Sequence, residues 1–307
     1  MIDTAAAVGD LGLVAGVRPT HHRALQISLG VVWLIAAALQ CQPVMFTPDF
    51  AGTTLSAAAA GNPGFVAAPI DWVVEQVQRF PVGANIAFIV IQAALGVGLL
   101  WRRTTKLALV GTVVWALAVW WLGEGFGGLF NGTANPLMGA PGAVLLYALL
   151  AVLIWPPRDE SQVRSPAGGG LVGHRLAAVL WLVLWGGFAV LSVLPVNWAP
   201  QNMIAGMANG EPGWLAGLDR SVGDALAGQG VLVSVLLCVV CALIAVGVVL
   251  PAPFARGAVV LAVVFALVSW VVGQNFGTVL TGNATDPNSG PLLVLLAVAY
   301  WPPARRP

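Results

Sequence analysis

Eight stretches of the chain are mostly apolar and contain no charged residue. About 20 such residues suffice for a helix to cross the hydrocarbon core of a bilayer. The apolar residues run continuously and do not alternate with polar ones, which argues against the strands of a membrane barrel. We therefore expect an all-α polytopic membrane protein with eight transmembrane helices. The expected helices occupy residues 24–41, 83–101, 107–122, 138–155, 176–194, 230–250, 257–273 and about 289–301.

Composition supports this assignment. Of the 307 residues, 59% are hydrophobic and only 8% are charged, whereas a water-soluble domain carries about 25% charged residues. So little charge cannot cover a surface that faces water, and the expected partner of most of the surface is the lipid bilayer. No basic run is long enough to suggest nucleic-acid binding. The abundance of Ala, Gly and Val suggests a bacterial protein, which places it in the cell membrane, the bacterial inner membrane.

One segment of the chain occurs twice. The residues 120–127 read WWLGEGFG and the residues 270–277 read WVVGQNFG, 150 positions later. Each copy ends at a Trp-Pro-Pro sequence, which begins at Trp155 and at Trp301. We therefore expect two four-helix membrane repeats, residues 24–157 and 175–303. Four helices are an even number, so both repeats enter the membrane in the same sense and form a parallel repeat.

Charge distribution predicts the orientation. In an eight-helix topology, 11 of the 13 Lys and Arg residues fall on one side, and only Arg79 and Arg220 fall on the other. Because basic residues stay cytoplasmic, the N-terminus and the C-terminus are expected inside the cell. The segment 1–23, the flexible Gly-rich linker 158–174 and the tail 304–307 are then cytoplasmic.

The two long outer loops, residues 42–82 and 195–229, are predicted to contain amphipathic helices. Ile70, Val77 and Phe80 share one helical face, as do Leu215 and Val222 in the second loop. Such helices lie on the outer surface or cover the end of the bundle.

The fourth and eighth helices are expected to be short. From Gly142 to Trp155 a helix reaches only about 21 Å, and from Pro291 to Trp301 about 16 Å, against a hydrocarbon core of about 30 Å. The Gly, Asn and Pro residues before them predict a broken or partly re-entrant backbone, which survives at membrane depth only if protein buries it or water reaches it. Any active surface is therefore expected on the outer side.

Glu124 is the strongest candidate for a function, since it follows an unbroken apolar run, where an ionisable group is costly. It is interpreted as a proton or cation site or as an anchor for a polar ligand. Alternatively, its carboxyl group holds a bend by hydrogen bonds to a neighbouring turn. The second copy has the uncharged Gln274 instead. The other ligand or ion candidates of the repeated segment are Asn275, Phe126, Phe276, Trp120 and Trp270.

Metal and cofactor sites are poorly supported. Cys238 and Cys241 share a helix face and could be two soft metal ligands, but small Cys side chains also pack well in membranes. The histidines lie beside arginines at the expected cytoplasmic face, which argues against haem held within the bundle. No cofactor is expected, and nothing in the sequence supports a quinone. Without a titratable partner for Glu124 in the spans, an enzyme acting on lipid or quinone is the least favoured interpretation.

A four-helix unit of this chain resembles the DoxX/DoxD-like membrane proteins. The features that carry the resemblance are Arg23 before Leu29-Gly30, the loop sequence Gly61-Asn62-Pro63, and the sequence 95–100 (LGVGLL) followed by Arg102-Arg103. The tandem arrangement and the G-x-x-F-G segment depart from that pattern. The resemblance implies an accessory subunit of a membrane oxidoreductase assembly and transfers no catalytic residue.

Two functions follow as hypotheses. The first is a membrane accessory or scaffold subunit that engages a membrane-protein partner at its outer face, in a redox assembly. It rests on the acidic, helix-bearing outer loops and the scarcity of catalytic side chains. The alternative is a small-solute or ion transporter with a site between the two repeats, near Glu124 and Gln274, for which a membrane-depth acid and parallel repeats are suited.

Overall fold

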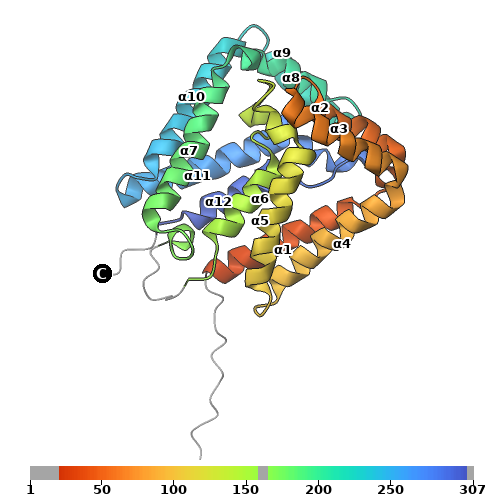
Figure 1. Ribbon diagram of the computed structural model, residues 1–307. Coiled ribbons are helices and arrows are strands. Elements are labelled where there is room, and N and C mark those ends of the chain that lie inside the picture. Colours follow the sequence, from red (N-terminus) through yellow and green to blue (C-terminus); the bar gives the residue numbers. More distant parts are fainter. Residues whose placement is uncertain (1–20, 158–164, 303–307) are drawn as a thin grey trace, which may run out of the picture.

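The computed structural model describes residues 21–157 and 165–302, and every regular element within them is helical (Figure 1). The α-helices are α1 (His21–Leu39), α2 (Ser56–Ala59), α3 (Gly64–Arg79), α4 (Pro81–Leu100), α5 (Thr105–Leu122), α6 (Ala143–Leu153), α7 (His174–Ser192), α8 (Pro200–Met207), α9 (Gly213–Ala225), α10 (Gly230–Gly247), α11 (Ala252–Val268) and α12 (Ser289–Ala299). The short turns between them are η1 (Pro43–Phe46), η2 (Phe50–Leu55), η3 (Gly125–Gly128), η4 (Pro136–Met138), η6 (Pro166–Gly168), η7 (Pro195–Asn197), η8 (Ser269–Gly273), η9 (Asn275–Gly277) and η10 (Val279–Thr281).

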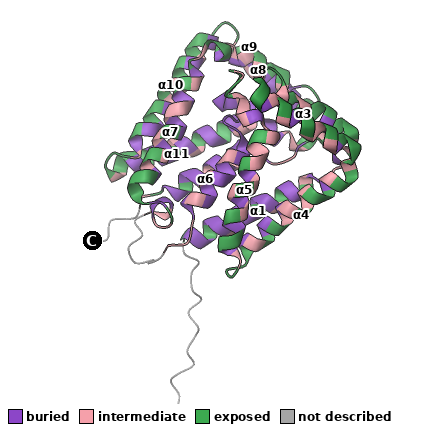
Figure 2. Ribbon diagram, viewed as in Figure 1, coloured by how far each residue is buried: buried purple, intermediate pink, exposed green. Residues whose placement is uncertain are grey.

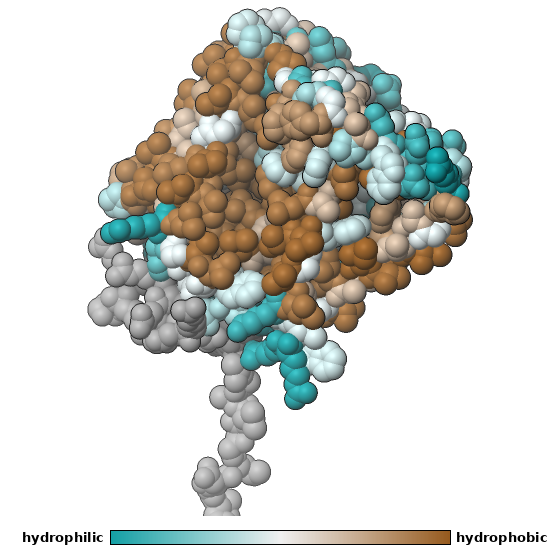
Figure 3. Space-filling view, in the orientation of Figure 1, coloured by the Kyte–Doolittle hydropathy of each residue, from teal (hydrophilic) through white to brown (hydrophobic). Residues whose placement is uncertain are grey.

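Six helices of the described residues are long and apolar enough to cross a membrane. They are α1, α4, α5, α7, α10, and α11 together with η8. Their outward faces remain uncovered by protein: Leu107 is 75% exposed, Val114 64% and Val183 66%. Figure 3 shows the resulting broad apolar surface, with hydrophilic residues concentrated toward its ends. These faces are suited to lipid, and the chain is an all-helical protein with the features of a multi-pass membrane protein.

The other two expected spans, α6 and α12, have only 11 residues each. Such helices extend about 16 Å, so by length the structure supports six of the eight expected spans. The prediction that both helices are short is confirmed. Eight residues of α6 and seven of α12 are buried, and α6 lies in the middle of the molecule (Figure 2). Because protein surrounds them, these helices and the irregular backbone before them need not match the bilayer thickness.

Helix packing follows the same order in both halves of the chain. Helix α1 packs along α4, and α7 packs along α10, while α5 contacts α6 and α11 contacts α12. The two central helices α6 and α12 also contact each other and join the halves. One apolar core includes residues of both halves. Trp33 packs against Tyr147 within the first half (ring centroids 4.1 Å apart), and Trp181 packs against Tyr300 within the second (4.6 Å).

The amphipathic helices expected in the outer loops are α3 and α9. They lie at the top of Figure 1, far from the turn between α4 and α5. Their inward faces are buried at Ile70 and Val77 in α3 and at Leu215 in α9. Phe80 was expected on the buried face of α3, but it is 70% exposed. It ends α3 with non-helical backbone angles (φ −135°, ψ 57°), so its ring leaves the register of the helix.

Part of the segment expected to be a flexible linker is packed. The turn η6 contacts α6 and α7, and Ala167 within it is fully buried. Residues 158–164 of the same segment lie outside the described residues, as do 1–20 and 303–307.

Side chains of α1 satisfy the carbonyl groups at the ends of α4 and α6. The Arg23 guanidinium donates to the carbonyl oxygens of Leu99 (2.9 Å) and Leu100 (2.5 Å) and to Thr105 Oγ1 (3.0 Å). Gln26 Nε2 donates to the carbonyl oxygen of Ile154 (2.9 Å). The last carbonyl groups of a helix have no partner within the helix, and a buried end needs such donors.

We expect Arg23→Met to destabilise the protein, because it leaves the buried carbonyl group of Leu99, the partly buried one of Leu100 and the Thr105 hydroxyl without their donor. The expected loss is about 2–4 kcal/mol, given that hydrogen bonds to charged groups contribute about 1.5–3 kcal/mol each and are not additive. Thermal melting in detergent measures the effect. Arg102→Met, at an exposed position of the neighbouring turn, is the control. Equal melting temperatures for both variants would contradict this role of Arg23.

Candidate functional site

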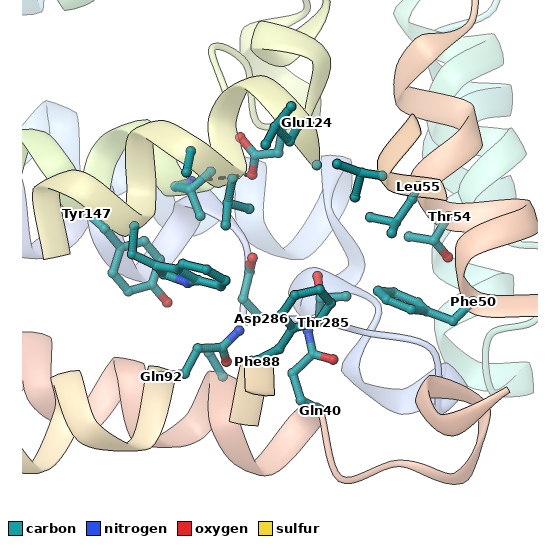
Figure 4. Close-up of a pocket in the computed structure, with 18 of the residues that line it drawn as sticks. Gln40, Phe50, Thr54, Leu55, Phe88, Gln92, Glu124, Tyr147, Thr285 and Asp286 are labelled. Carbon is teal, nitrogen blue, oxygen red and sulfur yellow. Dashed lines mark hydrogen bonds between the residues drawn. The ribbon is translucent and has the colours of Figure 1, made fainter. Parts of the chain in front are cut away.

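The structure contains a cavity of about 280 Å³ beside η2 and α3 (Figure 4). Its walls come from α1, η2, α3, α4, α5 and α6, and from the segment that precedes α12. The lining residues are Trp33, Ala36, Gln40, Phe50, Thr54, Leu55, Val73, Phe88, Gln92, Trp115, Ala118, Val119, Leu122, Gly123, Glu124, Val144, Tyr147, Thr285 and Asp286. Most of them are apolar, and the polar side chains converge on the interior of the cavity.

Glu124 lies on the wall of this cavity, just beyond the end of α5. The helix ends at Leu122, where the sequence predicted its end, so Glu124 lies two residues beyond it. Glu124 Oε1 accepts a hydrogen bond from the backbone N–H of Val144 (3.3 Å), in the first turn of α6. The partial positive charge of a helix N-terminus favours a carboxylate there. Glu124 Oε2 is buried and has no hydrogen-bond partner.

The backbone before α6 is shaped around this carboxyl group. Gly142 has φ +113°, and a Cβ atom built on it would overlap Glu124 Oε2. Trp120 Nε1 donates to the carbonyl oxygen of Pro141 (2.6 Å), which ties the turn to α5. Only glycine therefore permits the close approach between this turn and the carboxyl group.

Asp286 brings a second carboxyl group into the cavity from the other half of the chain. Its Oδ1 accepts from the backbone N–H of Asn288 (2.5 Å), and Thr285 beside it also lines the cavity. In Figure 4 the carboxyl groups of Asp286 and Glu124 point into the same space. Acids that are 162 positions apart in the sequence are thus brought to one site.

No basic side chain compensates these carboxyl groups, since no Lys, Arg or His lines the described part of the cavity. Both acids lie outside the six long helices. Burial raises the pKa of Glu124 well above its ordinary value, and the Asp286 carboxylate raises this pKa further, against the lowering effect of backbone hydrogen bonds from α6. Burial also raises the pKa of Asp286. The site therefore favours protonated carboxyl groups unless a positive charge enters it.

Uncharged polar groups surround the acids. Gln40, Gln92 and Tyr147 are buried, and Trp115 is half-buried. Each has an atom without a hydrogen-bond partner: Gln40 Oε1, Gln92 Oε1, Tyr147 Oη and Trp115 Nε1. Buried polar atoms are nearly always paired in native proteins. A group of unpaired atoms around one cavity indicates that water or a ligand supplies the missing partners.

Gln274, the counterpart of Glu124 in the repeated segment, lies outside the cavity and has its hydrogen bonds satisfied. Its Oε1 accepts from the backbone N–H of Gly290 (3.2 Å), and its Nε2 donates to the carbonyl oxygen of Leu137 (3.5 Å). Trp270 Nε1 donates to the carbonyl oxygen of Pro287 (2.8 Å), as Trp120 does to Pro141. The side chains of Glu124 and Gln274 are therefore held in similar ways but line no common site.

The remaining candidates of the repeated segment support the turns and do not line the cavity. Phe126 packs edge-on against Trp120 (4.9 Å between centroids), and Phe276 packs in the same way against Trp270 (5.1 Å). Asn275 Nδ2 donates to Asp219 Oδ2 (2.8 Å) beneath α9. These contacts hold the left-handed backbone of Phe126 and Phe276 in place.

The cysteines form no recognisable metal site. Cys41, Cys238 and Cys241 are all unpaired, and no group of three or more His, Cys, Asp or Glu residues in the described chain could hold a metal ion.

Sequence reasoning identified Glu124 but missed Asp286, Gln40, Gln92, Tyr147 and Trp115. Gln40 and Gln92 carried a usable signal, because an amide within an apolar run needs a hydrogen-bond partner. Asp286 had a weaker one: it is an acid in the segment before the short eighth helix, where an irregular backbone at membrane depth was expected.

The known proteins do not narrow the function further. No model of a protein family matches the chain, and neither the curated proteins nor the solved structures contain a match.

Proposed function

We propose that the chain is a membrane transport protein that binds a small solute in the cavity between Glu124 and Asp286. The observation that carries this proposal is Glu124 Oε2, a buried carboxyl oxygen without a partner, which faces a second carboxyl group in a cavity of about 280 Å³. Stable cores avoid unpaired buried acids, and ligand sites are cavities with apolar walls and a few convergent polar groups.

The architecture proposed for this transporter has eight membrane segments in two parallel repeats, with α6 and α12 as short central segments. The paired hydrogen bonds of Trp120 and Trp270 support a duplication. So do the tight helix crossings at Gly98 and Gly247, whose added Cβ atoms would meet Ala108 and Ala258. The charge distribution supports cytoplasmic termini in a bacterial inner membrane.

A comparison of the proposed repeats supports a functional role for the polar side chains that line the cavity. Aligning His22-Arg23 with His174-Arg175, Gly98 with Gly247, and Val144 with Gly290 pairs four polar residues of the cavity with residues of the second half. The pairs are Gln40 with Ser192, Gln92 with Cys241, Glu124 with Gln274, and Tyr147 with Leu293. If the fold itself required these polar groups, the second half would be expected to retain them.

The same alignment accounts for the presence of a cavity in the first half and for the side chains that fill the matching place in the second. Ala36, on the wall of the cavity, pairs with Phe188, which packs against Trp185 (5.2 Å between centroids) and Phe265 (6.3 Å) in the second half. Leu137 closes the space beside Gln274, because a Cβ atom on Gly273 would lie 2.9 Å from Leu137 Cγ. We infer that the first half retains an open site and that the second half is its filled counterpart.

We expect Ala36→Phe to reduce solute flux by at least about tenfold, since it copies Phe188 and fills the cavity, and a tenfold loss needs only about 1.4 kcal/mol. The assay uses proteoliposomes and three labelled probes with one carbon skeleton: phenethylamine, 2-phenylethanol and phenylacetate. Val31→Phe, which adds the same ring to the outward face of α1, is the control. A wild-type protein that moves none of the three probes faster than empty liposomes would contradict the transport proposal.

The second candidate is the accessory subunit that engages a membrane-protein partner, which the likeness to DoxX/DoxD-like units also favours. One observation supports it: the outer helices expose aromatic residues, with Phe65 61% exposed and Trp72 and Trp214 each 63%. Interfaces are enriched in such residues. Purification in mild detergent tests this candidate, and a chain that always emerges alone would argue against it.

A further inference from the structure

We propose that the solute bound in the cavity is a small organic cation, a protonated amine with an aromatic body. This inference rests on the proposed function, because it names the chemical class of ligand for the same site. The carboxyl groups of the cavity specify the charge of the ligand, and its aromatic walls specify the shape.

The charge of the ligand follows from the groups that face the cavity. The titratable side chains on its described walls are Glu124, Asp286 and Tyr147. An ionised carboxylate in such a place needs a positive partner, and the protein provides none on these walls. An anion would meet two carboxyl groups of like charge, whereas an ammonium group can donate to both. Figure 4 shows the two carboxyl groups directed into the shared space that the ammonium would occupy.

The aromatic body follows from the other walls. Five aromatic side chains line the cavity: Trp33, Phe50, Phe88, Trp115 and Tyr147. Trp33 packs on Tyr147, and Phe88 lies 5.9 Å from Trp115. Such rings attract a cation at their faces and bury an apolar body at the same time.

A metal ion fits the site less well than an amine. Hard cations such as Ca²⁺ require six to eight oxygen ligands in close contact. The oxygen-bearing side chains here are spread around a cavity of about 280 Å³, and no group of three or more His, Cys, Asp or Glu residues in the described chain could hold a metal ion. Apolar side chains occupy most of the remaining wall. An organic cation needs fewer polar contacts and fills the volume with its carbon atoms.

The neutral polar groups are assigned a role in orientation. Gln40, Gln92 and Tyr147 lie around the acids in Figure 4. Their unpaired atoms can exchange hydrogen bonds with the ammonium group or with a hydroxyl group on the ring of the ligand. This arrangement favours primary over quaternary amines, because a quaternary ammonium has no N–H to donate.

The test uses the full chain in lipid nanodiscs and compares phenethylamine with 2-phenylethanol and phenylacetate, which share one skeleton. Titrations are followed by tryptophan fluorescence, since Trp33 and Trp115 line the site. We expect saturable binding of the amine, at least about tenfold tighter than that of the alcohol, because hydrogen bonds to charged groups contribute about 1.5–3 kcal/mol. No saturable binding of the carboxylate is expected.

Variants separate recognition of charge from partition into lipid. Glu124→Gln and Asp286→Asn should each weaken amine binding by about tenfold or more while leaving the weak alcohol signal unchanged. Glu75→Gln, at an exposed position on α3 where Glu75 pairs with Arg79 (3.4 Å), should bind like the wild type. Ala36→Phe should abolish saturable binding of every probe.

The outcomes distinguish the inference from the proposed function. Equal affinity for the amine and the alcohol, or tighter binding of the carboxylate, would overturn the cation assignment while leaving a solute site in place. Absence of saturable binding for all three probes would overturn both. Amine binding that Glu124→Gln and Asp286→Asn do not weaken would place the cation elsewhere and refute the proposed contacts.

Discussion

Glu124→Gln should make the protein more stable at alkaline pH and weaken amine binding at the same time. Glutamine keeps the shape of the side chain and the hydrogen bond from the Val144 N–H, but it removes the buried charge. An unsatisfied buried group costs about 1–3 kcal/mol, and more when it is charged. At about 2–4 °C per kcal/mol for a chain of this size, the melting temperature at pH 8 should rise by about 3–8 °C.

The pH dependence identifies the cause of that stabilisation. Because the pKa of Glu124 is raised in the folded state, the folded protein holds a proton over a pH range in which the unfolded chain releases it. The free energy of unfolding therefore falls as pH rises from the ordinary carboxyl pKa through the raised one. Below the ordinary pKa this contribution is fully present, and the wild type and Glu124→Gln should differ little. The gap between them should open as pH increases.

Glu75→Gln controls for the loss of a carboxyl group as such. Glu75 is exposed and lies outside the cavity, so its variant should follow the wild-type melting curve at each pH. A melting difference between Glu124→Gln and the wild type that stays constant across pH would show that titration of Glu124 does not cause it. A stabilised variant that still binds the amine would separate the carboxyl group from recognition.

The opposite movement of stability and binding is the physical signature expected of a ligand site. If the carboxyl group only held a bend, removal of its charge would make the folded protein less stable. A carboxyl group kept for a cation destabilises the empty protein and regains favourable interactions when the ligand binds. The two interpretations of Glu124 that the sequence leaves open therefore predict opposite signs for one substitution.

Much of the fold was predictable because lipid imposes simple constraints. The long helices are visible as uncharged apolar runs, and the short α6 and α12 follow from the few apolar residues before each Trp-Pro-Pro sequence. Phe80 was misplaced because helical periodicity cannot show where a helix stops. The end of α5 at Leu122 was predicted correctly, but the apolar run does not show that Glu124 lies on the wall of a cavity.

The cavity itself could not be predicted, because its parts come from segments without a local pattern that links them. Asp286 reaches Glu124 only because the turn before α12 extends into the first half of the chain, and nothing in residues 279–288 indicates this direction. Gln40 and Gln92 lie on different helices, and their approach depends on the packing of α1 along α4. Sequence reasoning found the costly acid, but three-dimensional packing determines its partners.

Gly142→Ala should destabilise the protein and displace the carboxyl group of Glu124. Gly142 has φ +113°, which strains any other residue, and its added Cβ would overlap Glu124 Oε2 and approach Trp120 Cδ1 at 3.0 Å. Backbone strain of this kind costs about 1–3 kcal/mol, and overpacking costs about 1–3 kcal/mol more. We expect a loss of about 2–6 kcal/mol, seen as a fall in melting temperature, together with loss of amine binding.

Gly132→Ala separates the two causes. Gly132 also has a positive φ (+74°), but a Cβ atom there meets nothing within 4 Å, so this variant carries the backbone strain without the clash. It should lose only about 1 kcal/mol, near the lower end of the range for such strain, and retain amine binding. Suppose that Gly142→Ala had the same melting temperature as Gly132→Ala and still bound the amine. The turn before α6 would then not position Glu124. In that event the carboxyl group would have to be held by α5 alone. The hydrogen bonds that the turns at Pro141 and Pro287 share would then serve only to join the short helices to the bundle.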